Sequence, residues 1–256
     1  MSEPPGRLAR EAEFHDSLFA RGGREWLGGV NRLQAPARDL LDRRLRAGPR
    51  PGVVVEVGVG RVSRLADPGI RRGALGVALD ISQVGLRRAA VAAGSDVAFV
   101  RADAQRLPLR DGAVDLIVGT SIVHHLDVAT TAGEMARALS ADGRVLLLEP
   151  RVGSPLLRLF RRFTPGLRSA DEHPLTPRDM ATLRARFTAS KVDDFALTSL
   201  AAAPLLRKGV GGALAGALGR LDRVVLRLAP ALGRWAWIAV IELARPRRGS
   251  GHETLE

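Results

Sequence analysis

The feature that most constrains this chain is the segment 53–60, in which a β-branched run ends in an acid and two glycines separated by one residue. This pattern predicts a buried parallel strand that leads into a tight turn, where a ligand lies against bare backbone. Further apolar strands are expected at 76–80, which ends in Asp80, and at 97–100, soon followed by Asp103. Open α/β sheets bind ligands at the carboxyl ends of their strands, so the three acids together predict one cofactor site.

Strand and helix patterns alternate over residues 53–150, as a parallel sheet with crossover helices requires. We expect a fourth strand over 112–120, begun by Asp115 as a structural anchor, and a helix over 130–139. A turn at Asp142-Gly143 then precedes a fifth strand over 144–150, which ends at Glu149. Glu149 is interpreted as a cap of the sheet or as a cofactor contact.

The rest of the chain is expected to complete the same domain. Helices are predicted from Ser154 to Phe163 and over 176–187, and strands over 192–200 and 235–243. Between these strands one helix is expected, which needs a packing partner because its glycines weaken it. Its predicted apolar stripe consists of Leu214, Leu218, Leu221, Val225 and Leu228.

These patterns divide the chain into four segments. We predict an N-terminal helical lid over 1–50, a cofactor-binding core over 51–150, substrate-side helices with closing strands over 151–246, and a disordered tail over 247–256. The break after the first segment is the glycine- and proline-rich stretch 48–52.

Composition narrows the class of protein. The chain has 256 residues, 46% of them hydrophobic, which is enough for one large α/β domain. It has no cysteine, which excludes disulfides and thiolate metal sites. The net charge is +12, carried almost entirely by arginine, but the chain has no tyrosine and few other aromatics for base stacking. Nucleic acid is therefore not the expected partner, and without a signal peptide or an apolar span the expected location is the cytoplasm.

Details of the glycine turn separate it from a dinucleotide site. Glu56 stands two residues before the first glycine, where it repels a pyrophosphate and attracts a sulfonium or ammonium. Val62 and Ser63 follow Gly60, so the third glycine of a dinucleotide fingerprint is absent, and a β-branched residue such as Val62 does not readily adopt positive φ. Asp103 is suited to accept a hydrogen bond from an exocyclic amine.

With these pieces the chain resembles the class I S-adenosylmethionine-dependent methyltransferases. The matching segments are 56–60, 78–82, 102–108, 114–118 and 147–150, and the small-molecule branch near the ubiquinone and menaquinone biosynthesis enzymes is the most similar. The resemblance implies a Rossmann-like seven-stranded α/β sheet, mostly parallel with an antiparallel last strand and helices on both faces. It also implies S-adenosyl-L-methionine as cofactor.

By the same resemblance, particular residues receive roles. Glu56, Gly58 and Gly60 line the methionyl part of the cofactor, and Asp80, followed by Ile81, takes the ribose hydroxyls. Asp103 takes the adenine amine with the Ala104 backbone beside the ring, and Thr120 and Ser121 lie near the sulfonium.

Histidines are the candidate catalytic residues. His124 and His125 follow the fourth strand at the edge of the cleft, and His173 and His15 are further candidates from the two flanking segments. Histidine suits proton removal near neutral pH, although methyl transfer by in-line displacement also proceeds by positioning alone. Helix capping or packing is the alternative role of the histidine pair. We predict no metal site, because adjacent histidines rarely bind one ion and no carboxylate–histidine cluster is evident in the sequence.

The predicted function is methyl transfer to a small, hydrophobic acceptor such as an isoprenoid, polyketide or lipid-like molecule. Apolar stripes in 1–50 and 151–233 suggest that acceptor, and they serve equally well for internal packing or a homodimer contact. One alternative is a cofactor-binding relative that does not methylate, such as a cyclase or scaffold. A second is a peripheral membrane-binding protein that uses the basic helix from Ser154 to Phe163. A nicotinamide oxidoreductase is the least favoured reading.

Overall fold

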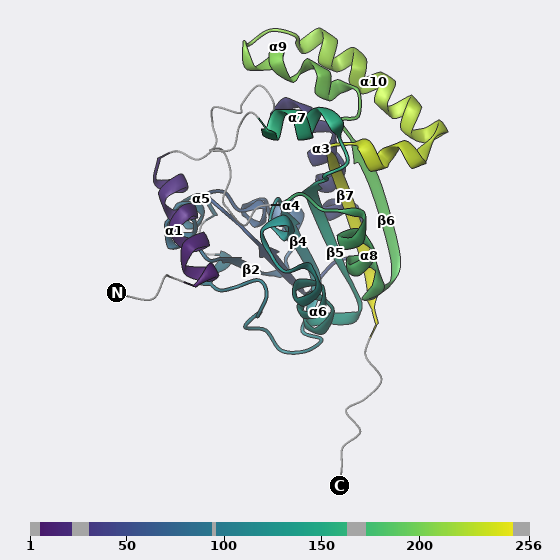
Figure 1. The fold of residues 1–256 in the computed structure, drawn as a ribbon. Coiled ribbons are helices and arrows are strands. Elements are labelled where there is room, and N and C mark those ends of the chain that lie inside the picture. The colour runs from purple at the N-terminus through teal and green to yellow at the C-terminus, as the bar shows by residue number, and fades with distance from the viewer. Residues whose placement is uncertain (1–5, 22–30, 94–95, 163–172, 248–256) are drawn as a thin grey trace.

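The computed structural model describes residues 6–21, 31–93, 96–162 and 173–247. Seven strands form one sheet in the order β3-β2-β1-β4-β5-β7-β6 (Figure 1). Neighbouring strands among β1 to β5 pair in parallel, and β7 is antiparallel to both β5 and β6. The expected Rossmann-like sheet is therefore confirmed. The strands are β1 Val53–Val57, β2 Leu75–Asp80, β3 Val97–Arg101, β4 Val114–Thr120, β5 Leu139–Pro150, β6 Phe187–Phe195 and β7 Ile238–Pro246.

Helices cover both faces of the sheet. Met135 and Leu183 pack on one face, whereas Leu41 and Leu45 pack on the other. The α-helices are α1 Arg7–Ala20, α3 Ala35–Ala47, α4 Pro68–Arg71, α5 Gln83–Ala93, α6 Val128–Ala138, α7 Pro155–Arg162, α8 Pro177–Ala185, α9 Ala203–Arg207 and α10 Gly212–Leu228. Short 3₁₀ turns are η2 Arg32–Gln34, η3 Arg64–Ala66, η5 Val123–His125, η7 Ser199–Ala202 and η8 Pro230–Trp235. Because both faces are buried, the central strands are continuous apolar runs.

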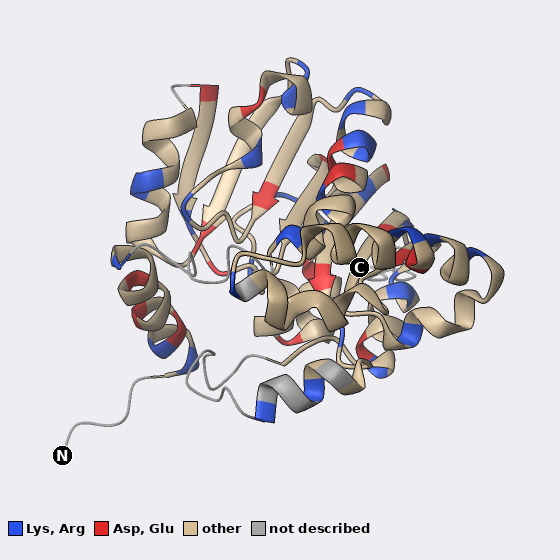
Figure 2. Cartoon of the chain, turned by 90° about the horizontal axis from the view of Figure 1, so that it is seen from above, with Lys and Arg blue, Asp and Glu red and all other residues tan. Residues whose placement is uncertain are grey.

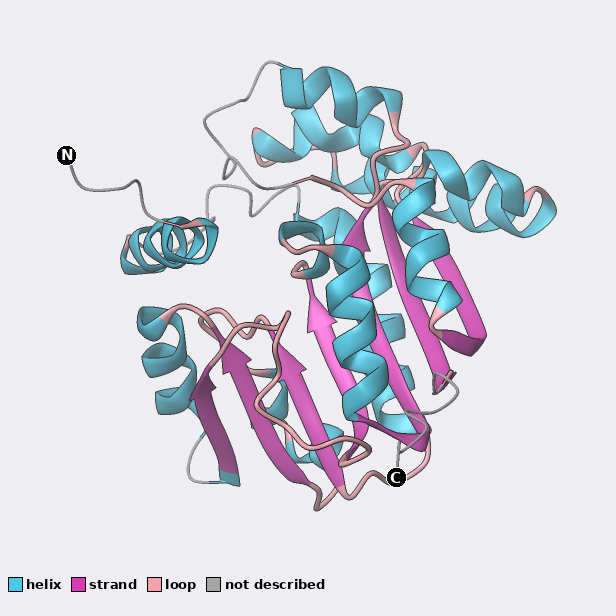
Figure 3. Cartoon of the chain, turned by 60° about the horizontal axis from the view of Figure 1, so that its bottom comes forward, coloured by secondary structure: helices cyan, strands magenta, loops and turns pink. Residues whose placement is uncertain are grey.

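The two ends of the sheet differ in what they carry. At the amino end of β4, the Asp115 carboxylate accepts hydrogen bonds from the backbone nitrogens of Gly52 (2.8 Å) and Val53 (3.0 Å), which confirms its anchoring role. At the carboxyl ends of the parallel strands lie α1 on one side and α7, α9 and α10 on the other (Figures 1 and 3). Figure 2 shows acidic positions at strand ends near the middle of the sheet and basic positions along the outer helices.

The closing strands begin and end elsewhere than expected. The Asp142-Gly143 turn lies inside β5, as a register shift between the pairs Val114–Leu139 and Leu116–Arg144. The sixth strand, predicted over 192–200, is Phe187–Phe195, an edge strand whose exposed and half-buried side chains show little apolar alternation. The seventh strand, predicted over 235–243, is Ile238–Pro246, because residues 230–235 form η8, which has a proline in its first turn.

Only part of the predicted apolar stripe of α10 is packed. Leu218 lies against the cluster that includes Leu200 and Leu206, whereas Leu214, Leu221 and Leu228 are 44%, 47% and 82% exposed. Asp222 is the buried residue of the helix, and its carboxylate accepts hydrogen bonds from Thr198 and Ser199 at η7. The side of the helix that faces the protein therefore carries a capping acid and takes in only part of the stripe.

The boundaries of the four predicted segments stay predictions, but the structure places their elements. In the segment 1–50, α1 lies at the carboxyl ends of the strands, whereas α3 packs mainly on the sheet through Leu41 and Leu45. The predicted tail 247–256 lies outside the described residues, apart from Arg247. Within the described ranges, no helix combines the length and the apolar character that crossing a bilayer requires.

Candidate functional site

The turn after β1 uses the conformational freedom of two glycines. Gly58 and Gly60 have φ angles of +69° and +61°. A Cβ atom on Gly58 would lie 2.6 Å from the Ile122 side chain, so only glycine fits there. Val62 is 68% exposed and is not among the described residues with positive φ. The loop therefore forms without the missing third glycine.

Glu56 stabilises this loop through hydrogen bonds. Its buried carboxylate accepts hydrogen bonds from the Ser63 hydroxyl (2.6 Å) and the Arg64 backbone nitrogen (3.0 Å). Burial raises the pKa of Glu56, and these hydrogen bonds oppose the rise. Glu56 thus organises the loop and also places a carboxylate under it.

Asp80 joins the ends of β1 and β2. One carboxylate oxygen accepts a hydrogen bond from the Gly60 nitrogen (2.8 Å), and the other accepts one from the Ser82 nitrogen (2.7 Å). Burial raises the pKa of Asp80 against the opposing effect of those two backbone hydrogen bonds. The carboxylate is thereby oriented by two loops at once.

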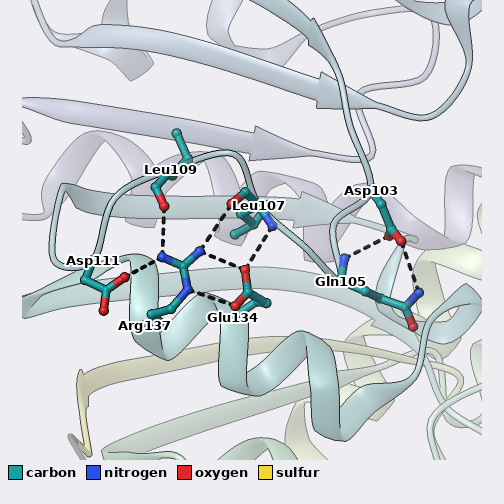
Figure 4. Close-up of polar contacts among 7 residues, drawn as sticks. All are labelled: Asp103, Gln105, Leu107, Leu109, Asp111, Glu134 and Arg137. Atoms are coloured by element: carbon teal, nitrogen blue, oxygen red, sulfur yellow. Dashed lines mark hydrogen bonds and ion pairs between the residues drawn. The ribbon is translucent and has the colours of Figure 1, made fainter. Parts of the chain in front are cut away.

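Asp103 lies in a loop that α6 holds in place. Its carboxylate accepts a hydrogen bond from the Gln105 nitrogen at 2.9 Å. Further along, Arg137 donates to the Leu109 carbonyl (2.8 Å), to Asp111 (2.6 Å) and to Glu134 (2.8 Å), as Figure 4 shows. These carboxylates raise the pKa of Arg137. Arg137 was not predicted from the sequence, since an arginine on an amphipathic helix gives no sign of this role.

The end of β4 carries a strained residue and a buried pair. Ser121 has a φ angle of +55°, which is uncommon for a residue with a side chain. In the η5 turn, His124 Nδ1 lies 2.7 Å from Glu149 Oε2. The other Glu149 oxygen accepts hydrogen bonds from the backbone nitrogens of Ile122 and Val123. Glu149 is fully buried and therefore fixes both the η5 backbone and the His124 ring.

Helix α1 closes the site from the other side. Asp16 accepts hydrogen bonds from the Ser82 hydroxyl and from the Val84 nitrogen (3.1 Å) at the start of α5. Nearer the amino end, Glu11 Oε2 lies 3.4 Å from His15 Nε2 and 3.5 Å from His125 Nδ1. Helix α1 is thus attached to both α5 and η5.

Together these elements enclose a cavity of about 790 Å³. A volume of this size suits a cofactor with a small second ligand. The cavity is lined by all the predicted cofactor residues, namely Glu56, Gly58, Gly60, Asp80, Ile81, Asp103, Ala104, Thr120 and Ser121. His124, His125 and His15 also line it. His173 is exposed and is not among the described lining residues; its backbone nitrogen donates to the His124 carbonyl.

One expectation about the histidines is wrong. No carboxylate–histidine cluster is evident in the sequence, but Glu11, His15 and His125 place one ligand atom each within 4.8 Å of one another. The cluster escaped notice because its residues come from α1 and η5, far apart in the chain. His124 does not share it, since its Nδ1 faces Glu149.

Comparison with known proteins identifies the architecture. The profile of the family described as "Methyltransferase domain" matches residues 55–147, and no curated protein matches the chain. Geranyl diphosphate C-methyltransferase from Streptomyces coelicolor A3(2) superposes with a TM-score of 0.60 at 17% identity, over 87% of this chain and 84% of that one. Magnesium protoporphyrin IX methyltransferase from Synechocystis PCC 6803 gives 0.52 at 15% identity, over 83% of each chain.

A third solved structure, an S-adenosylmethionine-dependent methyltransferase from Mesorhizobium loti, gives a TM-score of 0.53 at 21% identity, over 84% of this chain and 98% of that one. Identities this low show a shared fold. Residues 55–147 therefore form a methyltransferase domain, and the chain has the fold of the S-adenosylmethionine-dependent methyltransferases.

Proposed function

We propose that the cavity binds S-adenosylmethionine and that the enzyme transfers its methyl group to a small, hydrophobic acceptor. The observation that carries the cofactor site is the Asp80 carboxylate, which two backbone nitrogens orient at the cavity wall. An ionised carboxylate has about four lone-pair positions, so two remain for a pair of ribose hydroxyls.

The other cofactor contacts follow from the loops around Asp80. The backbone at Gly58 and Gly60 lets the methionyl part approach closely, because neither position carries a side chain. Asp103 and the Ala104 backbone receive the adenine ring, with the Arg137 network holding their loop. Glu56, Thr120 and Ser121 lie where a carboxylate and hydroxyl oxygens favour a sulfonium.

Methyl transfer then depends on positioning. The cofactor supplies a methyl group already activated on its sulfonium, and the protein holds the acceptor in line with it, an effect worth up to about 7–11 kcal/mol in model systems. Helix α1 covers the cavity and limits the access of water. Among the three histidines predicted to be catalytic, we choose His124 as the group that accepts a hydrogen bond from the substrate to be methylated. Its ring lies at the cavity wall, where Glu149 orients it. His125 and His173 stay predictions.

The part of the cavity wall that the predicted cofactor-binding residues do not form supports a hydrophobic methyl acceptor. Leu8, Leu18 and Phe19 from α1 and Ile122 and Leu126 near η5 line this part of the cavity. Two fold relatives are named for geranyl diphosphate and magnesium protoporphyrin IX, which both combine a large apolar body with anionic groups. An isoprenoid, polyketide or lipid-like acceptor is therefore the class to screen first.

Calorimetry with S-adenosylhomocysteine tests the cofactor site. We expect the unaltered enzyme to bind one equivalent, and Asp80→Ala to lose about 10- to 100-fold in affinity, since each hydrogen bond to a charged group contributes about 1.5–3 kcal/mol. Asp142→Ala, which removes an exposed carboxylate at the far end of β5, is the matched control and keeps full affinity. Absence of binding to the unaltered enzyme would overturn the proposal.

Transfer of a labelled methyl group to a panel of prenyl, polyketide and lipid acceptors tests the reaction. The non-methylating alternative was suggested by Val62, but the turn keeps both positive-φ glycines despite it, so that observation does not favour the alternative. A product heavier by one methylene unit, identified by mass spectrometry, would reject the alternative.

Two partner predictions concern the surface. Helix α7 presents Arg158 and Arg162 as exposed side chains, and α10 exposes Leu214 and Leu221. Basic residues beside apolar ones suit a membrane surface, and an apolar helix face suits a homodimer. Sedimentation with anionic vesicles at low salt tests the first, and light scattering after size-exclusion chromatography tests the second.

A further inference from the structure

The cluster of Glu11, His15 and His125 is not explained by cofactor binding. Glu11 and His125 are buried, and His15 is 17% exposed at its side chain. Glu11 Oε2 stands between the two imidazoles, 3.4 Å from His15 Nε2 and 3.5 Å from His125 Nδ1. Neither predicted cofactor contacts nor the packing of α1 requires these three side chains to converge.

The spacing of the three atoms fits a shared metal ion. Zinc bonds of about 2.0–2.2 Å to nitrogen and oxygen place neighbouring tetrahedral ligands about 3.3 Å apart. The two distances to Glu11 match that edge, and the third pair lies within 4.8 Å. Three protein ligands leave a fourth position open, and all three residues line the cavity.

The type of ligand selects the ion. Magnesium and calcium prefer oxygen ligands, whereas imidazole suits zinc and its first-row neighbours. The surroundings resemble those of a supported site, because the His125 ring lies 4.3 Å from the His124 ring, which Glu149 in turn orients. His15 Nδ1 is buried with no hydrogen-bond partner among the described residues.

We propose that Glu11, His15 and His125 form a binding site for a zinc ion, with one coordination position open to the cavity. The inference does not rest on the proposed methyl transfer. The ion joins the amino-terminal half of α1 to η5, while Asp16 joins the other half to α5. Occupancy of the site therefore closes α1 over the cavity.

The test uses the full chain without a histidine tag, freed of metal by dialysis against a chelator. Zinc is titrated by calorimetry and by competition with a chromophoric chelator, with magnesium as a control ion. We expect one equivalent of zinc to bind, millimolar magnesium not to displace it, and Glu11→Gln, His15→Asn and His125→Asn each to weaken binding about 100-fold or more. Glu13→Gln, an exposed glutamate on the same helix, is the matched control and keeps full affinity.

Protonated histidines paired with Glu11 offer the alternative explanation of the same distances. No zinc binding by the unaltered chain, or binding that survives all three substitutions, would overturn the proposal. Circular dichroism checks that the variants fold, and His15→Asn is the least buried of the three changes. Should variants misfold, the cobalt-loaded unaltered chain decides: its visible spectrum shows four-coordinate bands with nitrogen ligands if the site is correct, and the weak bands of the hydrated ion if it is not.

Discussion

The two walls of the cavity are built in different ways. On the β1–β3 side, the Glu56 carboxylate accepts a hydrogen bond from the backbone nitrogen of Arg64, eight positions away. The Asp80 carboxylate accepts one from the backbone nitrogen of Gly60, twenty positions away. On the α1–η5 side, Glu149 contacts His124, twenty-five positions earlier, and Glu11 contacts His125, 114 positions later. The contacts of the first wall therefore follow from local sequence patterns, whereas those of the second wall form only when distant segments of the folded chain meet.

The substitution expected to disrupt the first wall most strongly is at Gly58. Gly58→Val places a β-branched residue at positive φ and a Cβ atom against Ile122, so we expect unfolding free energy to fall by about 4 kcal/mol and S-adenosylhomocysteine binding to disappear. Urea unfolding and calorimetry measure both. Gly133→Ala is the control, because open space surrounds that helical glycine, and it stabilises by up to about 1 kcal/mol. Normal cofactor affinity in Gly58→Val would contradict our account of the turn.

For the second wall, the substitution expected to have the largest effect is at Glu149. Glu149→Ala leaves the Ile122 and Val123 nitrogens and the His124 ring without their acceptor, so we expect a loss of about 2–3 kcal/mol in unfolding free energy and a fall in methyl transfer. Glu149→Gln keeps one acceptor oxygen and should cost less stability. Equal stability of the alanine variant and the unaltered enzyme would show that η5 is held by other contacts.

Substitution of Arg137 tests whether its hydrogen bonds, which lie outside the cavity, help to stabilise the first wall. Arg137→Met removes donors to Leu109, Asp111 and Glu134, and we expect a stability loss of about 1–2 kcal/mol with a several-fold weaker binding of S-adenosylhomocysteine. Arg110→Met, an exposed arginine in the same loop, serves as control. If both variants bind alike, the loop does not need the network.

Glu56 predicts a pH dependence. Because burial raises its pKa above the ordinary 4.5, the folded state holds this proton more tightly than the unfolded state. The contribution of Glu56 to stability is therefore greatest at low pH and declines as pH rises from about 4.5 through the raised pKa. Relative to Glu56→Gln, the unaltered enzyme should lose stability across that interval in urea titrations. A constant difference between the two proteins would refute the raised pKa.

The smallest effect is expected at Val62. Its side chain is exposed and its backbone needs no positive φ, so Val62→Gly should change stability by no more than about 0.5 kcal/mol. Calorimetry should find the affinity for S-adenosylhomocysteine unchanged. A clear gain in affinity would mean that the third glycine matters after all.

The same contrast explains what the sequence predicted. Strands β1, β2 and β4 were recognisable because apolar runs end at acids or glycines, and the cavity residues on that wall follow directly from those strand ends. The edge strand β6 carries exposed and half-buried side chains, so alternation misplaced it by several residues. On α10, the leucine spacing predicted a stripe of which Leu218 packs inward while Leu221 and Leu228 stay exposed, and it gave no sign of the buried Asp222.

The second wall was only partly predictable. His124 and His125 were candidates because they follow β4, but nothing in their neighbourhood indicates Glu149 or Glu11 as partners. Such pairs depend on the strand order and on where α1 returns, neither of which has a local sequence signal. Arg137 was missed for the same reason, since its partners lie in the preceding loop.

Strand β7 has a consequence for how the protein is made. It is the last of the described strands in sequence, yet it pairs with β5 on one side and β6 on the other. Until residues 238–246 leave the ribosome, the nascent chain exposes the unpaired edge of β5, and β6 has no strand to join. Unpaired edges invite aggregation, so the synthesis of β7 is also the step that covers this edge of the sheet.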